Sequence, residues 1–255
     1  MKTKHRLIQG DCITEMKKLP KESIDLIVTS PPYNIGKEYE KVKPLEKYLN
    51  WTINWIDECY RILKPNGSFW LNLGYFNGYK KQAIPLTYFV FPLIKNFKFV
   101  QEIVWHYGAG VNCKRMFSPR NEKWMFFVKD INDYTFNLDY VRDKFGTKYP
   151  NQKKNGKLKC NPLGKNPTDV WIIKKVTSGK YRSSKERTKH PAQFPEEIIR
   201  RIIKVSSNEY ETVLDPFVGS GTTMKVAKEL NRNSIGIEIN KKYCKIALER
   251  LRTKN

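Results

Sequence analysis

Residues 213–223 read Val-Leu-Asp-Pro-Phe-Val-Gly-Ser-Gly-Thr-Thr, and residues 235–238 read Ile-Gly-Ile-Glu. The first stretch predicts a strand that runs into a glycine loop, and Glu238 lies at the end of the next expected strand. This is the plan of a nucleotide-type cofactor site, where glycine admits the ligand close to the backbone and a carboxylate holds ribose hydroxyls. The stretch has neither GxGxxG spacing nor the Lys-Ser/Thr of a phosphate-binding loop, so a cofactor with ribose and adenine but no pyrophosphate fits better. Alone, such a glycine turn is weak evidence.

The rest of the chain predicts an α/β fold. Short β-branched runs alternate with helical patterns, which favours a mainly parallel sheet covered by helices. The clearest strands are expected at 24–29, 68–73, 211–214 and 234–239. Helices are expected over 45–63, from Pro195 onward, over 222–230 and over 241–252. The first helix should stop at Lys64-Pro-Asn-Gly67.

Composition narrows the class of protein. The 255 residues include 48 Lys and Arg against 25 Asp and Glu, a formal net charge of +23, which indicates a polyanionic partner. The five cysteines are scattered without CxxC spacing, so we expect reduced thiols, no zinc site and no other metal. The opening residues lack the apolar stretch of a secretory signal, and the apolar run Leu86 to Ile94 is too short to span a bilayer. These features predict a cytoplasmic protein without membrane association.

One segment concentrates the positive charge. Val141 to Lys189 holds fifteen Lys or Arg against three Asp or Glu, and Gly, Asn and Pro punctuate it. Only the short run Val170-Trp-Ile-Ile173 predicts a strand there. We interpret the segment as a loop-rich basic insertion on a rigid core. A solvated charged loop that binds nothing is the alternative.

A second motif follows the expected strand 24–29 and reads Thr29-Ser-Pro-Pro-Tyr33. Two prolines end a strand abruptly and leave a carbonyl that no following amide can engage. Ser30 offers a hydroxyl acceptor and Tyr33 a flat ring, so the group can grip a planar ring that bears an amino group. A plain strand-to-loop turn is the alternative.

Together the two motifs resemble those of the S-adenosylmethionine-dependent DNA amino-methyltransferases of restriction-modification systems. Ser30-Pro-Pro-Tyr33 matches their catalytic signature Asp/Asn/Ser-Pro-Pro-Tyr/Phe, and Asp215 to Thr223 matches Asp-Pro-Phe-x-Gly-x-Gly-Thr-Thr. The resemblance continues in Gly10-Asp-Cys12, in 61–67 and in 190–195, and it covers nearly the whole chain. Since the catalytic motif precedes the cofactor motif, the order is similar to the family's beta arrangement. It implies a circularly permuted Rossmann-like methyltransferase fold with helices on both faces of the sheet.

The resemblance also implies roles for individual residues. Glu238 should hold the ribose hydroxyls, Asp11 the adenine amino group, and Thr222 should lie near the cofactor carboxylate. Phe194 departs from the lysine that many members carry. The cofactor-binding set that the resemblance implies is Asp11, Cys12, His190, Pro191, Phe194, Asp215, Pro216, Phe217, Gly219, Ser220, Gly221, Thr222, Glu238 and Ile239. The catalytic set is Ser30, Pro31, Pro32 and Tyr33, and the candidate DNA contacts are Arg142, Lys174, Lys175, Arg182 and Arg187.

The implied reaction moves a methyl group from S-adenosylmethionine to an exocyclic amino nitrogen of a flipped base in double-stranded DNA, leaving S-adenosylhomocysteine. Acceptors on Ser30 and Pro31 would localise the nitrogen lone pair, and stacking on Tyr33 would align the base. Serine at position 30 favours N4 of cytosine, and N6 of adenine is the alternative. An RNA or protein amino-methyltransferase and a non-catalytic DNA-binding relative also remain open.

The expected organisation has three parts. Residues 1–129 form the catalytic half of the methyltransferase domain, 130–189 a DNA target-recognition insertion, and 190–255 the cofactor-binding half. By analogy with the family, a homodimer is expected, with the aromatic-rich stretch Phe69 to Phe99 as one possible interface and core packing as the other explanation for it. A cognate restriction endonuclease is a further possible partner.

Overall fold

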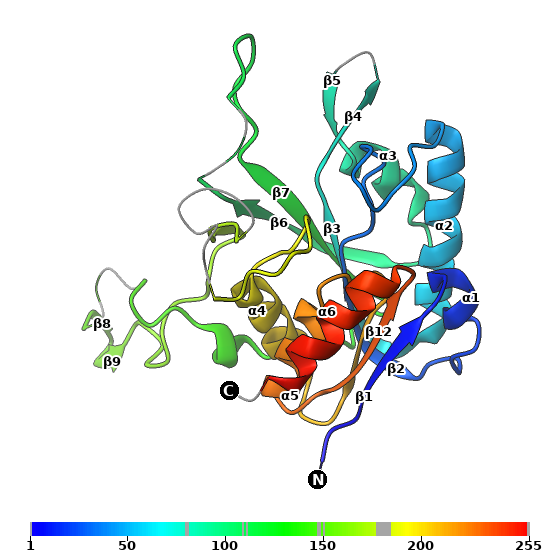
Figure 1. Ribbon diagram of the computed structural model, residues 1–255. Coiled ribbons are helices and arrows are strands. Elements are labelled where there is room, and N and C mark those ends of the chain that lie inside the picture. The colour runs from blue at the N-terminus through cyan, green and yellow to red at the C-terminus, as the bar shows by residue number, and fades with distance from the viewer. Residues whose placement is uncertain are drawn as a thin grey trace.

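The computed structural model describes residues 2–79, 82–108, 110, 112–146, 149, 151–176 and 185–253. Arg182 lies outside these residues. An eight-stranded sheet forms the centre of the molecule (Figure 1). Its strands, in spatial order, are β1 (His5–Gln9), β12 (Asn233–Glu238), β11 (Thr212–Asp215), β2 (Ile24–Thr29), β3 (Leu63–Leu73), β7 (Asn121–Val128), β6 (Lys98–His106) and β10 (Val170–Ile172).

The sheet is parallel except at β7, which runs antiparallel to both β3 and β6. The strands β2 and β11 pair directly, although about 180 residues separate them in the chain. The catalytic and cofactor motifs therefore follow neighbouring strands. The predicted α/β class, the permuted order and the mainly parallel sheet are confirmed.

Helices cover both faces of the sheet. One face packs against α1 (Cys12–Met16), α2 (Leu45–Ile62), α3 (Thr87–Val90) and the 3₁₀ turn η1 (Phe91–Leu93). The other face packs against α4 (Glu196–Ser206) and α5 (Thr222–Glu229), with α6 (Lys241–Arg252) beside α5 and β1 (Figure 1). Alternation along β2 explains both layers, because Ile27 belongs to the first core cluster while Leu26 and Val28 belong to the second.

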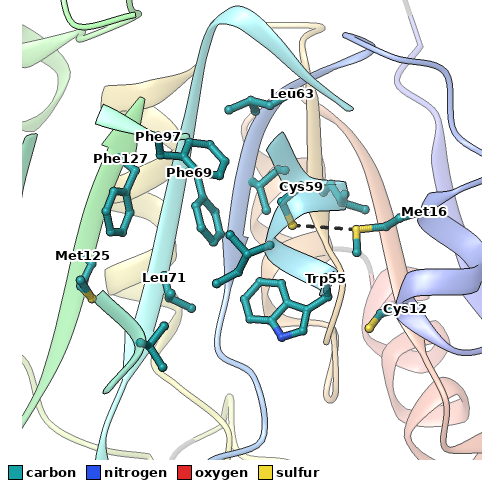
Figure 2. Packing of buried hydrophobic residues seen from close by; sticks show 14 of the residues in the cluster. Cys12, Met16, Trp55, Cys59, Leu63, Phe69, Leu71, Phe97, Met125 and Phe127 are labelled. Atoms are coloured by element: carbon teal, nitrogen blue, oxygen red, sulfur yellow. Dashed lines mark hydrogen bonds between the residues drawn. The ribbon is translucent and has the colours of Figure 1, made fainter. Parts of the chain in front are cut away.

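The first core cluster shows how α2 is held. Its buried residues include Trp55, Cys59 and Ile62, which recur every three or four positions and so share one face of the helix. In Figure 2 this face meets Phe69 and Leu71 of β3, and Cys59 lies 3.9 Å from the Met16 sulfur of α1. As expected, α2 ends before residues 64–67. These residues form an irregularity in β3, where the register with β2 shifts between Leu63 and Ser68.

The aromatic-rich stretch from Phe69 to Phe99 is mostly core. Phe69, Phe76 and Phe97 are buried in the first cluster, whereas Phe91 and Phe99 stay partly exposed. The apolar run 86–94 lies in α3 and η1. No helix among the described residues is long and apolar enough to cross a membrane.

The basic insertion is fastened to the core at both ends. Near its start, Asn137 donates to the Ser207 carbonyl after α4, and η2 (Leu138–Val141) packs against that helix. Near its end, β10 joins the main sheet beside β6. Between them lies the small hairpin of β8 (Lys153–Lys154) and β9 (Lys157–Leu158), which projects from the body in Figure 1.

Candidate functional site

The ends of the parallel strands bring the two motifs together. The strands β1, β12, β11, β2, β3 and β6 all finish at one edge of the sheet, and the antiparallel β7 begins there. The hairpin of β4 (Tyr75–Tyr79) and β5 (Gln82–Pro85) and the long connection from β6 to β7 rise from this edge in Figure 1. Ligands of open α/β sheets bind outside this edge, so we place the candidate site here.

The glycine loop between β11 and α5 has a backbone that only glycine tolerates well. Gly219 and Gly221 have φ of 48° and 79°. A Cβ on Gly221 would lie 2.8 Å from the Cα of Ala247 in α6. The loop is therefore pressed against α6 and turns tightly at the end of β11.

Acceptors lie at the ends of two adjacent strands, β12 and β1, which follow β11 in the sheet. At the end of β12 the Glu238 carboxylate accepts the Gly219 N–H at 3.0 Å and the Asn240 N–H at 2.8 Å, and burial raises its pKa. The next side chain, Ile239, is 68% exposed. After β1, Asp11 is exposed, and its Oδ1 caps α1 by accepting from the Thr14 amide and hydroxyl.

Asp215 joins the two motifs. Its buried carboxylate accepts the Thr29 hydroxyl and the Thr223 hydroxyl, both at 2.7 Å, and the Phe217 N–H at 3.1 Å. Burial raises its pKa to about 6, against the lowering effect of these donors. Thr29 ends the strand before the catalytic motif, and Thr223 lies in α5. The carboxylate is thus occupied by internal donors and fixes one motif to the other.

Arg250 of α6 supports the glycine loop from behind. Its guanidinium donates to the Ser220 hydroxyl at 3.1 Å, the Thr222 hydroxyl at 2.7 Å and the Glu196 carboxylate at 2.5 Å. The Ser220 and Thr222 side chains are buried. Their hydroxyls engage Arg250, and the proximity of Thr222 to a cofactor carboxylate stays a prediction. The sequence gives no signal for Arg250 beyond its place on one helix face.

His190 covers the glycine loop. A Cβ built on Gly219 would lie 2.9 Å from its Nε2, and its Nδ1 accepts the Ala192 N–H at 3.2 Å. The ring stacks on Tyr39 and meets Tyr243 edge-on, with ring centroids 5.9 Å and 4.3 Å apart. Burial, the largest effect, lowers its pKa to about 4, so the imidazole is neutral at pH 7.

The remaining residues of the expected cofactor set differ in exposure. Pro216 is buried, Pro191 is half-buried, and Phe217 packs edge-on against Trp55 with centroids 5.2 Å apart. The Cys12 side chain belongs to the first core cluster, where burial raises its pKa to about 12. Its thiol faces the core, and a contact of this residue with a cofactor stays a prediction. Phe194 packs against Trp124 in the second core cluster.

The catalytic motif forms a hydrogen-bonded group with two strands. Ser30 Oγ lies 2.9 Å from the Tyr33 hydroxyl, and that hydroxyl lies 2.7 Å from Asn72 Oδ1 of β3 and 3.3 Å from Glu122 Oε2 of β7. The Pro32 carbonyl accepts the Tyr48 hydroxyl at 2.8 Å. No hydrogen bond from any described residue reaches the Pro31 carbonyl, which stays available to a ligand.

The Tyr33 ring lies against the backbone of β3. A Cβ on Gly74 would meet the ring at 2.6 Å, so glycine is required where the ring approaches. Burial is the main cause that raises the Tyr33 pKa well above its ordinary range, so the hydroxyl stays protonated. Asn72 reaches the motif through the pairing of β2 with β3, and Glu122 reaches it through the pairing of β3 with β7, which the sequence did not reveal.

Two of the expected DNA contacts have internal partners. Lys175 pairs with Glu122 at 2.8 Å, and its ammonium lies 3.7 Å from the Tyr107 ring centroid. Arg142 pairs with Asp139 at 2.5 Å and donates to the Gly164 carbonyl. The contacts of both with DNA stay a prediction. Lys174 and Arg187 are exposed.

The amino-terminal ends of the strands carry a different hollow. Its lining residues are Lys21, Glu22, Tyr60, Arg61, Pro65, Lys129 and Asp130. It lies across the sheet from both motifs, so it is not the candidate site. Among the described residues no cluster of three His, Cys, Asp or Glu side chains could hold a metal ion.

Comparison with known proteins agrees with this geometry. A family model of N6/N4 methyltransferases, described as DNA methylase, matches residues 24–249. Type II methyltransferase M.ScaI of Streptomyces caespitosus is 52% identical over 96% of this chain and 80% of its own length. DNA adenine methyltransferase YhdJ of Escherichia coli (strain K12) is 38% identical over 96% of this chain and 82% of its own length.

Solved structures share the fold. The PvuII DNA methyltransferase (cytosine-N4-specific) has a TM-score of 0.77 at 20% identity, covering 100% of this chain and 89% of that one. The M1.HpyAVI–SAM complex has a TM-score of 0.64 at 24% identity, covering 98% of this chain and 100% of that one. With the sequence matches, and with both motifs side by side at one sheet edge, they lead to one conclusion: the chain belongs to the family of N6/N4 DNA methylases.

Proposed function

We propose that this chain transfers a methyl group from S-adenosylmethionine to an exocyclic amino nitrogen of a flipped base in double-stranded DNA. One observation carries the proposal. The acceptors Ser30 Oγ and the Pro31 carbonyl follow β2, and the Thr29 hydroxyl at the end of that strand bonds to Asp215, which begins the glycine loop. A base that meets these acceptors therefore lies next to a cofactor held by the loop.

The site fits S-adenosylmethionine. Each oxygen of Glu238 accepts one backbone N–H, which leaves further lone pairs for two ribose hydroxyls. Ile239 offers an exposed apolar surface for the adenine ring, and exposed Asp11 offers an acceptor for its amino group. Because Gly219 has no side chain, its backbone can lie close to the cofactor. The bound cofactor supplies an electrophilic methyl group on a sulfonium.

The residues of this chain prepare the nucleophile. An exocyclic amino lone pair is delocalised into its ring, so the nitrogen attacks poorly. Hydrogen bonds from the amino group to Ser30 Oγ and to the Pro31 carbonyl draw the nitrogen toward tetrahedral geometry and localise the pair. Stacking on Tyr33 fixes the base in line with the methyl group, so positioning supplies much of the rate.

For the base itself we propose cytosine, methylated at N4. Serine in the first catalytic position supports this choice. Adenine, methylated at N6, is the second candidate, and the name of the Escherichia coli relative favours it. Both bases present an amino group to the same acceptors, and the difference lies in how the rest of the pocket matches each ring.

A nucleoside analysis tests the proposal. DNA from a methylation-free host that expresses the protein is digested to nucleosides and examined by mass spectrometry, with Ser30→Ala as the control. N4-methylcytosine in the wild-type sample, absent from the variant, is the expected result. N6-methyladenine would replace the first candidate with the second. An unmodified sample from folded, cofactor-binding protein would overturn the proposal.

DNA is proposed to lie across the carboxyl edge of the sheet. The connection from β6 to β7 covers residues 107–120. It ends two residues before Glu122 of the catalytic group. It carries Lys114, Arg115 and a fully exposed Phe117. Cations position a phosphate backbone, and exposed apolar side chains on such loops insert between bases.

Target recognition is proposed for the basic insertion, with 1–129 and 190–255 as the two halves of the methyltransferase domain. The connection between η2 and β10, residues 143–168, exposes Phe145 and several lysines among its described residues. Exchange of 143–168 with the matching segment of a relative should change the methylated sequence and leave cofactor binding intact. Unchanged sequence specificity would refute this assignment.

A homodimer and a cognate restriction endonuclease are proposed partners. Tyr88, Phe91 and Phe99 supply exposed aromatic surface around α3 and η1 for a second copy. Light scattering at micromolar concentration is expected to give the mass of a dimer, and a monomer mass would refute it. Restriction of unmethylated DNA by an enzyme encoded beside this one would support the second partner.

A further inference from the structure

Asn72 lies behind the catalytic motif and ends a chain of hydrogen bonds. Its Nδ2 donates to the Lys123 carbonyl at 3.2 Å, which turns its Oδ1 toward the motif. Oδ1 lies 2.7 Å from the Tyr33 hydroxyl and 3.3 Å from Ser30 Oγ. An amide oxygen carries no proton, so every contact it makes here must be as an acceptor.

The protons of this group can be assigned in turn. The Tyr33 hydroxyl faces Asn72 Oδ1 at 2.7 Å and Glu122 Oε2 at 3.3 Å, and both oxygens accept, since the Glu122 carboxylate pairs with Lys175. Its single proton therefore points to this side, to the nearer Asn72. Its oxygen then has lone pairs left for the 2.9 Å contact with Ser30, and Ser30 must donate there.

We propose that Asn72 is a positioning residue that makes the Ser30 hydroxyl a fixed acceptor toward the target amino group. A hydroxyl can donate or accept, and the two orientations have opposite effects on the reaction. A donating hydroxyl would bind the nitrogen lone pair that must attack, whereas an accepting one draws on the N–H and frees that pair. With its only proton directed to Tyr33, Ser30 presents lone pairs alone to the ligand.

This inference rests on the proposed contact between Ser30 and the target amino group. It also explains why a serine needs support that a carboxylate does not. A carboxylate has no proton and accepts in every orientation. An aspartate at position 30 should therefore make Asn72 dispensable, which provides a test.

The experiment measures single-turnover methylation at saturating cofactor and DNA, together with both dissociation constants and the melting temperature. Asn72→Leu is expected to lower the rate on the order of tenfold to a hundredfold, as loss of a hydrogen bond that orients a site residue does. Both dissociation constants should stay within about twofold, since Asn72 touches neither ligand. Ser68→Ala is the control, because Ser68 lies on the same face of β3 and its buried hydroxyl has no partner among the described residues.

Two double-mutant cycles decide the mechanism. In a Ser30→Asp background, Asn72→Leu should change the rate by less than about threefold, and equal losses in both backgrounds would overturn the inference. The rate losses caused by Tyr33→Phe and by Asn72→Leu should not multiply in the double variant, because each substitution breaks the same chain of hydrogen bonds. Should Ser30→Asp be inactive, this second cycle decides, and a multiplicative loss refutes the inference.

The failure of the proposed function gives a different result. Unmodified DNA from the cofactor-binding wild-type protein would overturn the proposed function, whereas full methylation by Ser30→Ala would only remove Ser30 from the reaction and so refute this inference. An inactive Ser30→Ala together with a fully active Asn72→Leu would leave the proposed function in place and refute only the role of Asn72. These outcomes cannot be confused, since the first concerns the wild-type protein and the others concern the variants.

Discussion

Replacement of His190 by phenylalanine should abolish a specific dependence of stability on pH. Burial lowers the pKa of His190 from 6.5 to about 4 in the folded protein. Between these values the unfolded chain binds a proton that the folded protein excludes, so stability falls as the pH falls from 6.5 toward 4. Protonation would also turn Nδ1, which accepts the Ala192 N–H, into a donor.

The magnitude follows from the two pKa values. At about pH 5 the unfolded histidine is almost fully protonated and the folded one is mostly neutral, which corresponds to a loss of about 2 kcal/mol relative to neutral pH. Phenylalanine keeps an aromatic ring between Tyr39 and Tyr243 but cannot bind a proton. The variant should therefore lack this part of the loss between about pH 7 and about pH 5.

Urea unfolding of both proteins at these two pH values measures the effect. The compared quantity is the change in unfolding free energy between the two pH values, because a constant packing cost of the substitution then cancels. Asp215, with a pKa raised to about 6, titrates in the same window with the opposite sign, but it is present in both proteins. An equal pH dependence in the two proteins would refute the reasoning.

Three further substitutions test other contacts. Gly74→Ala should lower methylation at saturating cofactor by about fivefold to 160-fold, the effect of 1–3 kcal/mol of crowding against the Tyr33 ring; a wild-type rate would show that the ring moves freely. Arg250→Leu should lower the free energy of unfolding by about 1–3 kcal/mol, since it removes a charged donor from the buried Ser220 and Thr222 hydroxyls while Lys225 still pairs with Glu196. Calorimetry should also find weaker cofactor binding by this variant. Phe117→Ala should leave the melting temperature unchanged but weaken DNA binding several-fold in a fluorescence anisotropy titration, and equal affinity would remove the side chain from the interface.

Much of the fold follows from local patterns. The strand 24–29 and the helix 241–252 have the predicted bounds, because strong β-branched or amphipathic runs are bordered there by clear end signals. The strands β6 and β7 were not predicted. Their hairpin is closed by a long connection, and no short turn motif marks it.

The sequence predicted the site residues that belong to one motif. It did not predict those that strand pairing brings to the site. Ser30 and Glu238 stand at strand ends that the sequence marks. Glu122 reaches Tyr33 only because β3 pairs with β7, and a pairing register is not written in either strand alone. Lys175 was expected to contact DNA because a basic segment suggests exposed charge. In the structure its ammonium pairs with the Glu122 carboxylate.

The position of Asp215 has a consequence for the gene as well as the protein. One carboxylate binds Thr29 and Thr223 across two paired strands, so the catalytic and cofactor halves are joined sideways through the sheet. These hydrogen bonds do not depend on which half of the chain is synthesised first. An ancestral chain that is duplicated and trimmed can therefore reverse the order of the halves and still assemble the same centre.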